Sequence, residues 1–232
     1  MSKLCGRQYG SGLGDVRRIC RRPEGHLGRC SDMPFLMHLE QVKPKVADKI
    51  QRDSFNTRGA SWGKAMDGIQ KRRNRQPRWT VQAGDAFYPD HHQTYPNCLI
   101  VAAELTLQAY EMIGAPATPP EIAEVLPRIP VANSALCPIC KLPLEFSEFD
   151  LAVQSKAAID TDHLNPGLER RHTSGNVAFV HHGCNTTKGD RSLKEFEEWM
   201  AAVLRRHGYQ LSRLVEVQTS NDQSSNAGPV IS

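Results

Sequence analysis

The sequence predicts an α+β fold in which capped helices flank a small segment closed by metal ligands. Two features indicate this: apolar runs with helix start and stop signals, and two pairs of cysteine and histidine residues that bracket residues 141–180. The chain has 232 residues, 39% of them hydrophobic, which is enough apolar material for a core. No apolar run approaches the ~18 residues of a membrane helix. The N-terminus has no apolar segment either, so we expect a cytoplasmic protein without membrane contact.

Composition divides the chain into regions with different expected roles. Residues 1–33 are rich in Arg, Gly and Cys, and residues 34–134 are first basic and then helical in pattern. Residues 135–208 hold the densest set of chemically active side chains and are expected to form one domain. The tail, 217–232, is rich in Ser, Asn and Gln and has little apolar surface to bury, so we expect it to be disordered.

The net charge of +4 hides an asymmetry along the chain. Residues 1–78 contain 18 lysines and arginines against 7 acidic residues, a net charge of +11, whereas residues 79–232 carry a net charge of −7. A basic first part favours a polyanionic partner, and nucleic acid is the first candidate. A well-solvated basic surface is the alternative, because a split in charge is a correlation and not a mechanism.

Four potential metal ligands lie in the first region. They are Cys5, Cys20, His26 and Cys30, and the spacing of the last three resembles that of zinc fingers. The sequence therefore predicts a second zinc site here, and reduced cysteines on a flexible arm are the alternative. Arginines within this region would make a compact element that contacts phosphates or guanines: Arg17, Arg18, Arg21 and Arg22.

Three segments carry helix signals. Segment 97–114 has an asparagine ahead of an apolar run and a glycine after it. Segment 118–121 has the spacing of a capping box, with proline at the first helical position. Segment 192–195 is a second capping box and leads into an apolar stripe at helical spacing, closed by Gly208. We expect these helices to be scaffold.

The two ligand pairs predict a structural zinc site. Cys137 and Cys140 form a Cys-x-x-Cys turn, and His181 and Cys184 form a second pair with the same two-residue gap. Four such ligands suit a tetrahedral Zn²⁺, which would supply folding energy to the segment that they close. His182 is the alternative to His181 as the fourth ligand. A lone redox Cys-x-x-Cys is the alternative to zinc, although no thioredoxin-like pattern surrounds it.

Three further motifs lie between and just beyond these ligands. They are Ile-Asp-Thr-Asp-His-Leu-Asn-Pro-Gly at 159–167, Gly-Asn-Val-Ala-Phe-Val at 175–180 and Cys-Asn-Thr-Thr-Lys-Gly-Asp at 184–190. Together with the ligand pairs they resemble the zinc-containing HNH (ββα-metal) nucleases, whose pattern combines Cys-x-x-Cys, Asp-His, a central Asn, and Cys-Asn followed by Lys-Gly. The resemblance covers residues 135–191 and implies a zinc-stapled ββα-metal nuclease core.

The chemistry of these residues suits phosphodiester hydrolysis. The reaction needs a base to activate water and a cation to neutralise charge on the phosphate. His163 is a suitable base because the imidazole group in general titrates near neutral pH, and Asp162 offers a hard oxygen ligand for a divalent cation. Adjacent strand residues point to opposite faces, so one can hold metal while the other reaches the phosphate. Asn185 directly follows a zinc ligand, which would fix its position.

The resemblance implies a role for each motif residue. Asp162 and Asn185 correspond to the ligands of the catalytic metal, and His163 corresponds to the general base. Asn176 corresponds to the central asparagine, which ties the loop between the strands together, and Lys188 lies where a phosphate contact is expected. The family would use Mg²⁺ or another divalent metal for catalysis beside a separate structural Zn²⁺.

Each of these residues also has a plainer interpretation. Asp160 and Asp162 would then be solvated loop carboxylates, His163 a buried histidine, and Asn185 the cap of the following helix. For two further histidines, His172 and His182, we expect surface or phosphate-contact roles.

A basic stretch precedes the predicted helices. Beside a nuclease motif, phosphate binding is the favoured interpretation of this stretch, which contains Lys71, Arg72, Arg73, Arg75 and Arg78. The whole chain then resembles a Type II restriction endonuclease of the HNH class, acting on double-stranded DNA as a homodimer that cuts both strands. The alternatives are a phage-type nicking or branch-resolving HNH endonuclease and a non-catalytic zinc DNA-binding protein.

Overall fold

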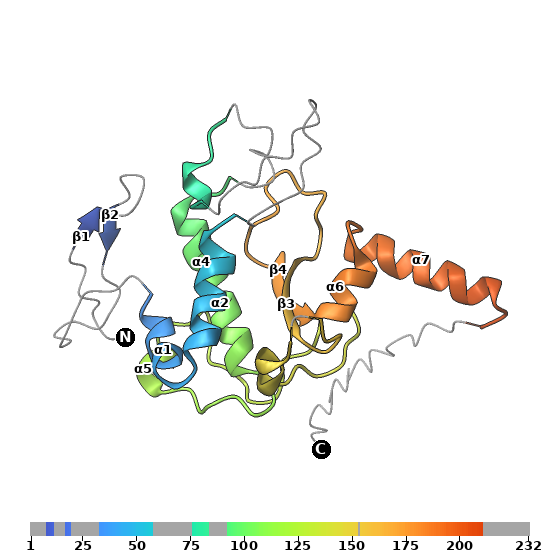
Figure 1. The fold of residues 1–232 in the computed structure, drawn as a ribbon, viewed down its shortest axis with the longest axis horizontal. Coiled ribbons are helices and arrows are strands. Elements are labelled where there is room, and N and C mark those ends of the chain that lie inside the picture. The colour runs from blue at the N-terminus through green and yellow to red at the C-terminus, as the bar shows by residue number, and fades with distance from the viewer. Residues whose placement is uncertain are drawn as a thin grey trace, which may run out of the picture. The chain divides into compact units, whose positions relative to one another are not determined.

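Helices and short two-stranded sheets make up the part of the chain that the structure describes (Figure 1). A computed structural model describes residues 33–57, 76–83, 92–152 and 154–210, with the backbone of an antiparallel pair of strands, β1 (Gln8–Ser11) and β2 (Arg17–Ile19). The chain divides into two units, Met1–Phe196 and Glu197–Ser232. The mixed helix and strand content of the predicted fold class is thus confirmed. Within the described residues no helix has the length and apolar character needed to cross a membrane.

Several residues singled out in the sequence lie outside the described part, and their roles stay predictions. They are Cys5, Cys20, Arg21, Arg22, His26, Cys30, Lys71, Arg72, Arg73, Arg75 and the tail 217–232. Arg17 and Arg18 lie in β2, where only the backbone is described.

The first described helices lead into a long amphipathic one. A 3₁₀ turn, η1 (Pro34–Leu36), and α1 (Met37–Val42) precede α2 (Pro44–Phe55). Proline in the first turn of α2 is favourable because that position needs no amide hydrogen. Val46 and Ile50, one turn apart, are fully buried, whereas most charged side chains of α2 remain accessible. The buried face of α2 packs against the central helix α4.

Helix α4 (Tyr95–Tyr110) is buried on most of its circumference and forms the centre of the core. It begins two residues before the predicted start, because Thr94 takes the cap position and a proline occupies the first turn. The amide of Asn97 instead donates a hydrogen bond of 2.9 Å to the side chain of Gln93. The helix ends ahead of Gly114, whose φ of +73° suits the glycine predicted as its stop signal.

A strand, a second strand and a helix follow one another in the predicted metal segment. β3 (Ile159–His163) pairs antiparallel with β4 (Val177–His181), and α6 (His182–Lys188) starts at once. Gln108 of α4 covers the outer edge of β4: its amide accepts from the Phe179 N–H at 2.8 Å and donates to the Phe179 carbonyl at 3.0 Å. Both backbone groups of Phe179 are therefore satisfied, and the sheet is held against the core helix.

The remaining elements are short connections. They are the 3₁₀ turns η2 (Arg78–Thr80) and η3 (Phe146–Asp150) and the single helical turn α5 (Pro120–Ala123). The capping box predicted for segment 118–121 is absent: Pro119 holds the cap position of α5 and its side chain makes no capping hydrogen bond. Proline has no side-chain acceptor, so it fixes the entry angle without satisfying an amide.

The last helix, α7 (Leu193–Arg206), starts as its sequence predicts. Ser192 accepts from the Glu195 N–H at 3.2 Å, and Glu195 accepts from the Ser192 N–H at 2.8 Å. These reciprocal bonds are the predicted capping box. Gly208, with φ of +83°, follows the end of the helix.

Candidate metal centre and active site

The structure brings the four predicted zinc ligands together. The side-chain donor atoms of Cys137, Cys140, His181 and Cys184 all lie within 4.8 Å of one another. The first two come from the turn after α5, and the other two from the end of β4 and the first turn of α6. Cys140 Sγ lies 3.3 Å from His181 Nδ1. Three thiols and one imidazole in this arrangement are a donor set that fits a tetrahedral metal ion such as Zn²⁺.

Of the two candidate histidines, His181 belongs to this cluster. It is the last residue of β4, so its side chain is placed by the sheet. His182 Nδ1 lies 3.5 Å from the Asp160 carboxylate instead. The histidine favoured by the two-residue gap in the sequence is thus the one that the structure places beside the three thiols.

The chemical environment of the cluster favours a bound cation. Burial, together with the neighbouring thiols of Cys137 and Cys140, raises the pKa of Cys184 to about 12. Thiols packed in this way lose their protons when a metal ion supplies compensating positive charge. Glu148 adds a carboxylate 3.5 Å from His181 Nε2, on the ring nitrogen that does not face Cys140. A carboxylate in this position orients a metal-binding imidazole.

Strand β3 presents different side chains to the helices on its two sides. Thr161 donates a hydrogen bond of 2.9 Å to Asp53 of α2. Asp160 accepts a hydrogen bond of 2.6 Å from the side-chain amide of Asn185 of α6. Asp162 forms an ion pair of 3.2 Å with Lys188, also of α6. The alternation expected of a strand thus directs both aspartates toward α6.

The pairing of the aspartates differs from the sequence prediction, which grouped Asp162 with Asn185. In the structure Asn185 meets Asp160, whereas Asp162 meets Lys188. Strand residues two apart share one face of the strand, and helix residues three apart share one face of the helix, so both pairs can form where β3 and α6 meet. Two parallel contacts between β3 and α6 result.

The predicted phosphate contact of Lys188 is corrected by its burial. The Lys188 side chain is fully buried, and its Nζ donates to the carbonyl oxygens of His163, Gly189 and Arg191 at 2.8–3.2 Å. With Asp162 as a further partner, the ammonium is enclosed by oxygen atoms of its own chain. Lys188 therefore ties the end of β3 to the segment that follows α6, and a phosphate does not reach it in this conformation.

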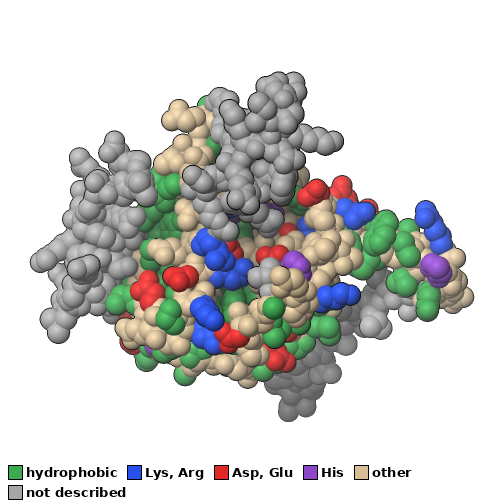
Figure 2. Space-filling view, viewed as in Figure 1, with side chains coloured by type: hydrophobic (Ala, Val, Ile, Leu, Met, Phe, Trp, Pro, Cys, Tyr) green, Lys and Arg blue, Asp and Glu red, His purple; other side chains and the backbone are tan. Residues whose placement is uncertain are grey.

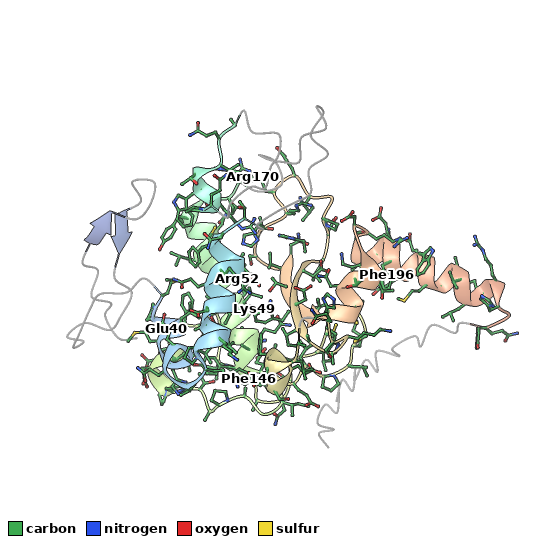
Figure 3. All side chains as sticks on the ribbon, in the orientation of Figure 1. Glu40, Lys49, Arg52, Phe146, Arg170 and Phe196 are labelled. Carbon is green, nitrogen blue, oxygen red and sulfur yellow. The ribbon has the colours of Figure 1, made fainter. Side chains whose placement is uncertain are left out.

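A cavity of about 660 Å³ opens between α2 and β3. His163 and Asp160 line it from β3, and Lys49, Arg52 and Asp53 line it from α2. Figure 3 shows Lys49 and Arg52 on this helix, and Figure 2 shows basic and acidic side chains interspersed on the same face. Burial opposes ionisation of Asp53, but Lys49 and Arg52 outweigh it and hold the pKa of this carboxyl below its usual value. The cavity wall therefore carries fixed charges of both signs.

His172 also lines the cavity, contrary to the surface role expected for it. It is 2% exposed, its Nε2 lies 2.8 Å from the Ser54 carbonyl oxygen of α2, and its Nδ1 lies 3.2 Å from His163 Nε2. Burial, reinforced by the charge of Arg78, lowers the pKa of His172 to about 3. His172 is therefore uncharged near neutral pH.

Asn176 holds the loop between β3 and β4. Its side-chain carbonyl oxygen accepts a hydrogen bond of 2.8 Å from the Asn165 N–H. Its side-chain amide nitrogen donates to the backbone carbonyl oxygens of Asn165 and Arg171 at 3.0 and 2.6 Å. Arg78, expected to contact DNA, is only 4% exposed and lines the cavity rather than an outer surface.

A solved structure described as a type II restriction endonuclease superimposes on this one with a TM-score of 0.65. The two sequences are 30% identical, and the match covers 90% of this chain and 99% of the other. This chain belongs to the type II restriction endonucleases. A family profile described as DraIII matches residues 88–184, and the comparison with curated proteins gave no match.

Three residues of this restriction endonuclease lie at the metal cluster or in the cavity but are not predicted as site residues from the sequence. Glu148 forms a capping box with Glu145 at the start of η3, and the three-residue spacing of the two glutamates is a sequence signal that could have placed it. No catalytic role is predicted for Asp160 from the sequence, although its two-residue spacing from Asp162 on a strand places both on one face. His172 had no local signal, because its partners come from other segments of the chain.

Proposed function

We propose that this restriction endonuclease is a metal-dependent HNH enzyme that hydrolyses double-stranded DNA at specific sequences. The observation that carries the proposal is the position of His163, which lies in a cavity wall at the end of β3 and directly follows Asp162, while the strand paired with β3 ends at His181 of the Cys₃His cluster. In this proposal β3, β4 and α6 are the ββα-metal unit. A homodimer would present two such sites, one for each DNA strand.

The Cys₃His cluster would hold a structural Zn²⁺. Its ligands join the turn at Cys137–Cys140 to the junction of β4 and α6. Metal binding would fix the start of α6, and with it Asn185, the residue after the last ligand. Because the ligands come from distant segments, the free energy of metal binding would act as free energy of folding.

Oxygen donors suited to the catalytic metal come from β3 and α6. Asp160, Asp162 and Asn185 offer two carboxylates and one amide, which are the ligand types preferred by Mg²⁺ and similar cations. The contact of 2.6 Å between Asn185 and Asp160 brings two of these donors close without a metal. When bound, such a cation supplies positive charge against the charge that grows on the phosphate and the leaving oxygen.

His163 would act as the general base. It takes a proton from a water molecule as the water oxygen forms a bond to phosphorus and the bond from phosphorus to the leaving oxygen breaks. The basic side chains of α2 in the same cavity, Lys49 and Arg52, would hold the DNA backbone beside it. Asp53 keeps both side chains in place through ion pairs of 3.0 and 3.1 Å.

The test is cleavage of unmethylated phage DNA by the full chain with Mg²⁺, with and without EDTA. Discrete fragments that disappear with EDTA are expected. His163→Ala should lower the cleavage rate about 10²–10⁴-fold, the range of a lost general base, with zinc content and folding unchanged. His207→Ala, an exposed histidine after α7, is the matched control and should cut normally. Undiminished cleavage by His163→Ala would overturn the assignment of the base.

A further inference from the structure

A buried histidine pair links the proposed base to helix α2. His163 Nε2 and His172 Nδ1 are 3.2 Å apart, and His172 Nε2 is 2.8 Å from the Ser54 carbonyl oxygen. Ser54 belongs to the last turn of α2, where carbonyl groups lack partners within the helix. The imidazole of His172 therefore satisfies a helix-end carbonyl with one nitrogen and contacts His163 with the other.

The hydrogen positions in this chain of contacts follow from simple rules. A carbonyl oxygen can only accept, so His172 Nε2 must carry the hydrogen that bonds Ser54. Burial keeps His172 uncharged, and its Nδ1 then holds a lone pair and can only accept. The hydrogen between the two rings must therefore belong to His163 Nε2. In neutral His163 the unprotonated nitrogen is accordingly Nδ1.

We infer that His172 is a positioning residue that fixes the tautomer and ring orientation of His163, so that Nδ1 is the nitrogen that takes the proton from water. The inference rests on the proposed role of His163 as base. It assigns part of the active site to α2 and to the loop between β3 and β4, beyond the ligands and motif residues themselves. A base held as the wrong tautomer presents an N–H to the water and cannot accept its proton.

The surroundings of His172 are built to hold it still. The His172 carbonyl accepts a hydrogen bond of 3.0 Å from the amide of Gln93, which is itself fully buried. Gln93 in turn accepts from the Thr94 N–H at 2.8 Å, at the start of α4. Asn176 holds the neighbouring carbonyl of Arg171. The ring is thus fixed through both its side chain and its backbone.

The experiment compares two replacements of His172 in the full chain. His172→Leu removes both hydrogen bonds, whereas His172→Gln retains an acceptor and a donor. We expect His172→Leu to lower kcat about 10–100-fold with little change in KM, as for other residues that orient a functional imidazole, and His172→Gln to recover most of the loss. His92→Leu is the matched control, because His92 contacts a backbone carbonyl of Val81 at 3.2 Å but does not line the cavity.

A second readout does not depend on activity. The ¹⁵N shifts of the His163 ring in histidine-labelled protein report its tautomer, and the signals are assigned by their loss in His163→Ala. We expect the Nε2–H form in the wild type and in His172→Gln, and a mixture in His172→Leu. An Nδ1–H form in the wild type, or an unchanged tautomer and kcat in folded His172→Leu, would overturn the inference.

The two proposals fail in different ways. If His172→Leu does not fold, the test rests on His172→Gln. A folded His172→Gln protein in which His163 has changed its tautomer contradicts the inference. Active His163→Ala protein would instead overturn the base itself, whatever the tautomer of the wild-type ring.

Discussion

The side-chain amide of Asn185 donates a hydrogen bond of 2.6 Å to the carboxylate of Asp160, which joins the first turn of α6 to β3. Asn185 directly follows Cys184, one of the four clustered ligands. A metal ion bound by the cluster would therefore hold one end of this contact in place. The same contact brings together two of the oxygen donors proposed for the catalytic cation.

Asp160 is expected to be essential for cleavage and dispensable for folding. Asp160→Asn keeps the size of the side chain and one of the two oxygens that accept from the Thr161 N–H and the Asn185 amide, but it removes a charge that the proposed cation needs. Cleavage should fall at least about 100-fold, with the loss partly offset at higher Mg²⁺ or Mn²⁺ concentration. Initial rates across a metal titration measure this. Glu40→Gln, at an exposed carboxylate of α1 that does not line the cavity, is the control, and equal rates for the two variants would remove Asp160 from the donor set.

Lys188 is expected to matter for stability. Lys188→Met leaves the buried carboxylate of Asp162 without its ion-pair partner at 3.2 Å, and loss of one member of a buried pair typically costs about 3–5 kcal/mol. The free energy of unfolding in urea measures the effect, with the exposed Lys194→Met as a control that should change little. Adding Asp162→Asn to Lys188→Met should recover part of the loss. A stable Lys188→Met protein with weakened DNA binding would restore the phosphate contact predicted from sequence.

Features that depend on neighbouring residues were predictable from the sequence. The capping box of Ser192 and Glu195 and the choice of His181 over His182 follow from spacings of two or three residues. The predicted start of α4 was wrong. A proline can stand either before a helix or in its first turn, and here it stands in the first turn, so the helix starts at Tyr95.

Contacts between distant segments were not predictable. Whether Asn185 meets Asp160 or Asp162 depends on how α6 slides along β3, and no local pattern specifies that offset. His172 depends on Ser54, which is 118 residues away in the chain. For His172 the sequence shows only a histidine in a polar loop, and such a residue is expected to be exposed rather than buried.

The Cys₃His cluster is expected to bind one Zn²⁺ that can be removed by a single substitution. Cys140→Ser should lower the zinc content by one ion per chain and reduce the free energy of unfolding, because the metal links distant segments. Elemental analysis of the purified full chain measures the zinc. Cys98→Ala is the matched control, since Cys98 is fully buried in α4 outside the cluster. Equal zinc content in both variants would contradict the assignment of the site.

Acid is expected to destabilise the protein through His172. Burial lowers the pKa of this ring to about 3 in the folded chain, whereas an unfolded histidine titrates near 6.5. Between these values the unfolded chain binds a proton that the folded chain does not, so the free energy of unfolding falls as the pH falls. The contribution is fully present above pH 6.5 and is lost at about 1.4 kcal/mol per pH unit below it.

His172→Gln isolates this effect from other groups that titrate in acid, because both proteins retain them. The stability of the wild type relative to His172→Gln should decrease by about 2 kcal/mol between pH 7 and pH 5, measured by urea unfolding at each pH. His92→Gln, at a half-buried histidine that does not line the cavity, is the matched control. Parallel stability curves for the wild type and His172→Gln would mean that the ring of His172 is charged, or open to water, in the folded chain.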